Sequence, residues 1–133
     1  MLETDITVAS YWITNPNNIV TNNRGAGSEW YSFWYQINDH PTGPSATSDI
    51  CPPGLKLGAF KDNVAHSNGR FGLRILEMAP RTFPCQPSRD DTLADPFSTN
   101  PSFETVFENF ITWKNNEDGI LGELLGDITF RNF

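Results

Sequence analysis

The chain has 133 residues, a hydrophobic fraction of 38%, a charged fraction of 19% and a formal net charge of −7. This composition indicates a folded globular chain, and no apolar run approaches the roughly 20 residues that a membrane-spanning helix needs. Residues 90–133 carry nine acidic side chains against Lys114 and Arg131, so no basic surface is available and nucleic acid is excluded as a partner.

A repeated unit runs along the chain. Each copy has an aromatic strand, an asparagine, a short second strand, a polar turn, a small residue and a third strand. The copies are centred on residues 23–35, 63–75 and, with one extra residue, 107–122, and a fourth begins at 130–133. The unequal spacing predicts two inserted loops, residues 38–57 and 78–103, which are rich in Pro, Ser, Thr and Asp.

Repetition with loops inserted at matching places is typical of a solenoid. We therefore predict an all-β fold: a right-handed parallel β-helix, a pectin-lyase-like solenoid, with about four coils over residues 1–133. Helix is expected to be minor, and the one weak candidate, residues 103–110, suits a strand equally well. Because the last copy stops partway and residues 1–5 lack signal-peptide character, we expect a partial domain of a longer ectodomain whose secretion signal lies elsewhere.

Two features follow from stacking the copies. Phe33, Leu73 and Ile120 should point to one side of the third strand, with Trp34, Arg74 and Leu121 on the other. Asparagine suits sharp corners, and equivalent amides on successive coils can hydrogen-bond to one another. The aligned copies predict one such ladder, made of Asn23, Asn63, Asn109 and Asn132.

The two cysteines, Cys51 and Cys85, each lie in a proline-rich stretch within an inserted loop. They form no CxxC pair, so a zinc or redox motif has no support. We predict a disulfide between the loops, with two free thiols as the alternative. A disulfide implies an oxidising compartment and therefore an extracellular or cell-surface location.

The first inserted loop opens with Asp39 and His40, and His66, which aligns with Ala26 of the previous copy, could meet this loop. With Asp49, these side chains could form an acid–base or metal site above one face of the helix. The alternative is structural, with Asp39 capping a turn and His40 bonding a backbone carbonyl. The acidic C-terminal stretch leaves calcium as a possible ligand, although a solvated acidic surface is the commoner explanation.

Two aromatic residues align with arginines on the following copy: Trp30 with Arg70, and Trp34 with Arg74. Such pairs can form cation–π contacts that stabilise the outer face. They can also form a sugar platform, in which a tryptophan stacks on a pyranose and an arginine binds a carboxylate. No matched pair of carboxylates suits glycoside hydrolysis, and Glu117, Asp118, Glu123 and Asp127 are expected in solvated turns.

Several rare strings occur in one order between residues 11 and 77. They are residues 11–18, Asn23, 26–28, 32–35, 40–45, 57–60 and 63–69. With these strings the chain resembles the β-helix region of the fibrocystin and fibrocystin-L family, and the related cell-surface hyaluronidases and hyaluronan-binding proteins. The resemblance implies a parallel β-helix in a long extracellular protein that is often membrane-anchored.

We therefore expect a structural or interaction module that acts as a rigid scaffold and is not an enzyme. Its expected partners are the rest of its own ectodomain, and glycans or other extracellular proteins. The rival hypothesis, which the hyaluronidase resemblance implies, is a glycan-binding or polysaccharide-degrading β-helix. Its residues to test are Asp39, His40, His66 and Arg74.

Overall fold

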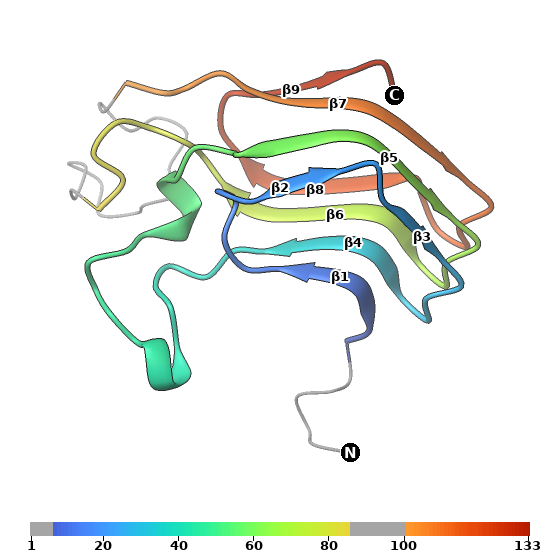
Figure 1. Ribbon diagram of the computed structural model, residues 1–133, viewed down its shortest axis with the longest axis horizontal. Coiled ribbons are helices and arrows are strands. Elements are labelled where there is room, and N and C mark those ends of the chain that lie inside the picture. Colours follow the sequence, from blue (N-terminus) through green and yellow to red (C-terminus); the bar gives the residue numbers. More distant parts are fainter. Residues whose placement is uncertain (1–6, 86–100) are drawn as a thin grey trace.

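The structure, a computed structural model, describes residues 7–85 and 101–133 and contains two parallel β-sheets (Figure 1). The first sheet has the order β1 (Ala9–Ile13), β4 (Tyr31–Gln36), β6 (Phe71–Met78) and β8 (Ile120–Leu125). The second has the order β2 (Ile19–Thr21), β5 (Ala59–His66), β7 (Thr105–Trp113) and β9 (Ile128–Arg131), while β3 (Arg24–Ala26) also pairs with β5. The chain passes from one sheet to the other in turn, which confirms the predicted all-β class and parallel pairing.

Helix is minor in the described part of the chain. It consists of two short 3-10 turns in the first inserted loop, η2 (Gly43–Ser45) and η3 (Pro52–Gly54). The weak helix candidate, residues 103–110, instead leads into and forms most of β7. Among the described residues, we find no helix whose length and apolar character would let it cross a membrane.

The register of the first sheet matches the prediction. Phe33 pairs with Leu73 and Leu73 with Ile120, while Trp34 pairs with Arg74 and Arg74 with Leu121. Phe33 and Leu73 are fully buried between the two sheets. Trp34 belongs to a separate cluster on the outer face, together with Tyr31 and Phe71. From Phe33 onward, alternation separates the core from Trp34, whereas Tyr31 and Phe71 at the strand starts depart from it and join the outer cluster.

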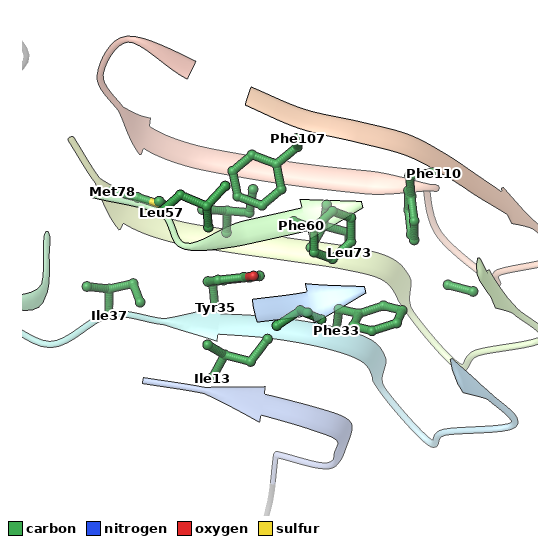
Figure 2. Close-up of a cluster of buried hydrophobic side chains, with 13 residues drawn as sticks. Ile13, Phe33, Tyr35, Ile37, Leu57, Phe60, Leu73, Met78, Phe107 and Phe110 are labelled. Carbon is green, nitrogen blue, oxygen red and sulfur yellow. The ribbon is translucent and has the colours of Figure 1, made fainter. Parts of the chain in front are cut away.

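Aromatic and aliphatic side chains together form the core between the sheets (Figure 2). Phe60 of β5 lies at its centre, with ring centroids 5.4 Å from Phe33, 5.2 Å from Phe107 and 5.5 Å from Phe110. The Phe33 and Phe110 contacts are edge-on, an arrangement that the charge distribution of aromatic rings favours. Large rings from both sheets therefore fill the interior of a small stack.

The predicted asparagine ladder is wrong as a single column. Asn23 does bond to Asn63, whose Oδ1 accepts from the Asn23 backbone N–H at 2.9 Å. Phe110 pairs with Asn63, however, and Asn109 donates to Asp62 Oδ1 at 2.8 Å. Asn132 then donates to Asn109 Oδ1 at 3.0 Å. Two adjacent columns exist, displaced by one residue.

The backbone explains this displacement. The corner between β2 and β3, the bends within β5 and β7, and the end of β9 are made by residues with left-handed backbone. These are Asn22, Asp62, Asn109 and Asn132, with φ of 57°, 56°, 49° and 54°. Asp and Asn both tolerate this conformation, so aspartate replaces asparagine at one corner. Matching only asparagines therefore misaligned the third copy.

A further polar column, which was not predicted from the sequence, joins the opposite turns. Asn68 Nδ2 donates to Asn115 Oδ1 at 2.7 Å, and Asn115 Nδ2 donates to Thr112 at 2.7 Å. Asn68 Oδ1 accepts from the buried Ser32 hydroxyl at 2.9 Å. Asn68 is only 3% exposed, so these bonds satisfy polar groups that would be costly to bury alone.

Cys51 and Cys85 form a disulfide with Cα atoms 5.2 Å apart, as predicted. It joins the first inserted loop to the described beginning of the second, whose residues 86–100 lie outside the described chain. The loop is also held by the backbone, since Ala79 N donates to Pro53 O at 2.8 Å and Arg81 N to Gly54 O at 3.0 Å. The loop around η3 is therefore docked against the stack.

Tyr35 gives a stability prediction. Its ring is fully buried, and within the described structure its hydroxyl has no hydrogen-bond partner. Because leaving a buried hydroxyl unpaired is costly, Tyr35→Phe is expected to raise the free energy of unfolding by about 1 kcal/mol. Tyr11→Phe is the matched control: its partly exposed hydroxyl donates to Arg24 O at 3.4 Å, so a small loss is expected.

The stability gained by Tyr35→Phe should be larger at high pH. Burial raises the pKa of Tyr35 above its usual range. Above the ordinary tyrosine value of about 10, the unfolded chain ionises this phenol while the folded chain retains the proton. The unaltered chain therefore loses stability as the pH rises above about 10, because only its unfolded state gains from ionising Tyr35. Tyr35→Phe has no phenol at this position and avoids that loss. Urea unfolding of both proteins at pH 7 and above pH 10 tests this; a stability loss in Tyr35→Phe would contradict it.

Candidate functional site

The outer face of the first sheet carries the aromatic and arginine residues predicted as a glycan platform. Trp30 and Arg70 do meet, with the guanidinium carbon 5.1 Å from the ring centroid. Arg70 also donates two hydrogen bonds to Glu117, at 2.7 and 3.2 Å. These bonds raise the pKa of Arg70 above its usual value. The guanidinium that would bind a ligand carboxylate therefore already binds one from the protein.

The second predicted pair is arranged differently. Arg74 pairs with Trp34 in the strand register, but its guanidinium lies over Tyr31, 5.5 Å from the ring centroid. It donates to the Tyr31 hydroxyl at 2.9 Å and to Glu123 at 3.2 Å. Register alone did not identify the ring that Arg74 contacts, because its long side chain reaches diagonally across the sheet.

Trp34 is wrong as a sugar platform. It is 5% exposed and stacks against Trp12, with ring centroids 5.1 Å apart. Trp12 pairs with Trp34 across the first two strands, so the sheet register places one ring over the other. The exposed ring of this stacked pair is Trp12, at 53%, which was not a candidate in the sequence-based prediction. Because side chains alternate along a strand, Trp12 could have been predicted to point outward from its place next to the buried Ile13.

The predicted acid–base or metal site does not form. His40 lies in the first loop, where its Nδ1 contacts Ile50 O at 3.0 Å. His66 is the last residue of β5 and stacks on Trp113 at 4.4 Å. The first loop joins the start of β5, and eight extended residues span roughly 20 Å, so the two histidines are far apart. The assumption that the loop folds over this face was the error.

No metal centre is present in the described chain either. Residues 7–85 and 101–133 contain no group of three or more His, Cys, Asp or Glu side chains that could hold an ion. Asp39 and Asp49 lie exposed in the first loop. Asp90, Asp91 and Asp95, which contribute to the acidic stretch, fall outside the described residues.

Several glutamates of the acidic stretch have structural partners. Glu117 and Glu123 bind Arg70 and Arg74 of the preceding copy. Glu108 lies 2.7 Å from Arg131 and 3.9 Å from Lys61. Glu117 and Glu123 are solvent-exposed as expected, but each also forms an ion pair, and Glu123 lies in β8 and not in a turn. Their half-exposed position makes each pair worth little energetically, so their main effect is on register and specificity.

A polar hollow remains beside the first loop, with a volume of about 310 Å³. Hydroxyl and amide side chains dominate its lining, together with His40 and two prolines. The lining residues are Thr14, Asn15, Asn38, His40, Pro41, Thr42, Ser45 and Pro52. These groups can hydrogen-bond a polar ligand, but the lining has no carboxylate pair of the kind that glycoside hydrolysis uses.

Stacked parallel strands, polar columns at the corners and an aromatic core define a repeat protein of the β-helix class. Residues 2–73 match the family model described as CEMIP beta-helix. The chain belongs to this family, and the resemblance to fibrocystin-L and its hyaluronidase relatives is confirmed.

The relatives are much longer than this chain. Fibrocystin-L from Mus musculus is 39% identical over 135 residues, which covers 90% of this chain and 3% of the relative. Fibrocystin-L from Homo sapiens is 38% identical over 100% of this chain and 3% of the relative. The cell surface hyaluronidase CEMIP2 from Homo sapiens is 31% identical over 94% of this chain and 10% of the relative. No solved structure gives a significant match.

Proposed function

We propose that this chain is a structural module of an extracellular or cell-surface protein, forming about four coils of a right-handed β-helix. It acts as a rigid scaffold between other parts of a longer ectodomain. The parallel registers, the dense aromatic core and the disulfide-anchored loop support this proposal. The fibrocystin-L relatives, of which the chain spans 3%, support a module of a larger molecule.

One observation carries the proposal: side chains suited to glycan chemistry are already used to hold neighbouring coils together. Trp34 is buried under Trp12, while Arg70 and Arg74 are bound to Glu117 and Glu123. Forming a carboxylate site from these arginines would require breaking contacts that align the coils. The scaffold needs no bound cofactor.

A glycan-binding module is the second candidate. Two relatives are named as a cell surface hyaluronidase and a hyaluronan-binding protein. The exposed ring of Trp12 could stack on a sugar, and the hollow beside His40 offers hydroxyl and amide groups. This candidate requires that binding depend on Trp12 and not on the arginines.

The test is to incubate the chain with long hyaluronan, with and without a calcium chelator, and to measure polymer length and tryptophan fluorescence. We expect unchanged polymer length and no saturable fluorescence change. Shortening that disappears in His40→Ala or His66→Ala would overturn the scaffold proposal in favour of an enzyme. Saturable binding lost in Trp12→Ala but kept in Ile19→Ala, a change at another exposed apolar position, would establish the glycan-binding module instead.

A further inference from the structure

The two sulfurs of the disulfide differ in accessibility. Cys51 is 1% exposed and is followed directly by the buried turn η3. Cys85 is partly exposed at the outer end of the linkage. A thiolate attacks a disulfide at one sulfur and expels the other. A thiolate from solvent can therefore approach Cys85, and Cys51 must be the leaving group.

His40 lies beside this leaving group. Its Nδ1 is 3.0 Å from Ile50 O and 3.7 Å from Cys51 Sγ. Because a carbonyl oxygen only accepts hydrogen bonds, Nδ1 carries a hydrogen, which it donates to Ile50 O and shares with the neighbouring Cys51 Sγ. This N–H lies close enough to stabilise the negative charge that develops on the departing Cys51 sulfur.

We propose that Cys51–Cys85 is an exchangeable disulfide and that Cys85 is a site of covalent modification by small thiols. The thiolate of a low-molecular-weight thiol attacks Cys85 Sγ, forming a new S–S bond while the Cys51–Cys85 bond breaks. The electron pair of the broken bond remains on Cys51 Sγ, which His40 stabilises by donating from Nδ1. The product is a mixed disulfide at Cys85 and a free thiol at Cys51, with no net oxidation or reduction.

The loop remains docked after the bond opens. Pro53 O still accepts from Ala79 N, and Gly54 O from Arg81 N. Pro52, Pro53 and Gly54 are buried, so η3 stays packed and Cys51 stays shielded from solvent. The exchange therefore leaves Cys51 protected and places the added group on the outer cysteine.

The test uses the full chain in its disulfide form, with glutathione as the probe. Products are alkylated, digested and located by mass spectrometry. We expect glutathione on Cys85 and the alkylating label on Cys51. Glutathione on Cys51, or equal amounts on both cysteines, would overturn the proposal.

The rate tests the role of His40. Exchange is faster when the leaving thiol is more acidic, so His40→Ala should react roughly three- to tenfold more slowly. His40→Asn keeps an N–H donor for Ile50 O, so it should react faster than His40→Ala. His66→Ala, at the other histidine, should react like the unaltered chain. If His40 only holds the loop, His40→Ala would loosen it, expose Cys51 and react faster than the unaltered chain, which would overturn the proposed role.

Discussion

Phe60→Ala is expected to lower the free energy of unfolding by about 3–5 kcal/mol, because it empties the centre of the core. Phe60 is 1% exposed and contacts rings from both sheets. The surrounding rings belong to different coils and are fixed by strand pairing, so they can close the resulting cavity only in part. Chemical denaturation of the two proteins measures the loss.

The matched control for Phe60→Ala is Ile111→Ala on β7. Ile111 is 62% exposed on the outer face of the second sheet. Its replacement should change stability by no more than about 0.5 kcal/mol. Similar losses for the two variants would show that Phe60 does not lie between the sheets.

Replacing both cysteines, Cys51→Ala with Cys85→Ala, is expected to cost about 3 kcal/mol. The bond closes a segment with a sequence separation of 34, and its loss gives the unfolded chain greater conformational freedom. The folded core should persist, since the backbone bonds of Pro53 and Gly54 still hold the loop. Denaturation of the variant beside the unreduced chain measures the effect.

The control is the unaltered chain treated with a reducing agent. It should unfold at nearly the denaturant concentration of the double variant, because both lack the same cross-link. A double variant as stable as the oxidised chain would mean that the bond contributes nothing to folding.

The repeat and the inward or outward direction of the third strand were predictable from sequence. Side chains alternate along a strand, so a single correct alignment places Phe33, Leu73 and Ile120 together. The disulfide was also predictable, because both cysteines lie in loops inserted into the repeat. These features depend on local periodicity, which survives the insertion of loops.

The corner residues were harder to predict because backbone conformation matters there more than residue identity. Asp62 takes the place of an asparagine, and this moved the expected ladder by one residue. Glu117 and Glu123 lie 47 and 49 residues after the arginines they bind, and the second inserted loop separates them from those partners. No local pattern indicates such partners until the coils are stacked.

The candidate site failed for a related reason. Sequence suggested which residue types could act together, but the direction in which the first loop leaves the stack determines their distance. His40 stays beside the disulfide, while His66 ends a strand and stacks on Trp113. The burial of Trp34 under Trp12 likewise depends on register between two coils.

The central claim is that parallel coils stack in one register and thereby use the outer aromatic and arginine side chains for packing. Nuclear Overhauser contacts in solution test it most directly. The account predicts contacts from the Phe33 ring to the Leu73 methyls, and from the Leu73 methyls to Ile120. A register displaced by one residue would turn Leu73 outward and abolish both contacts, and that result would contradict the account.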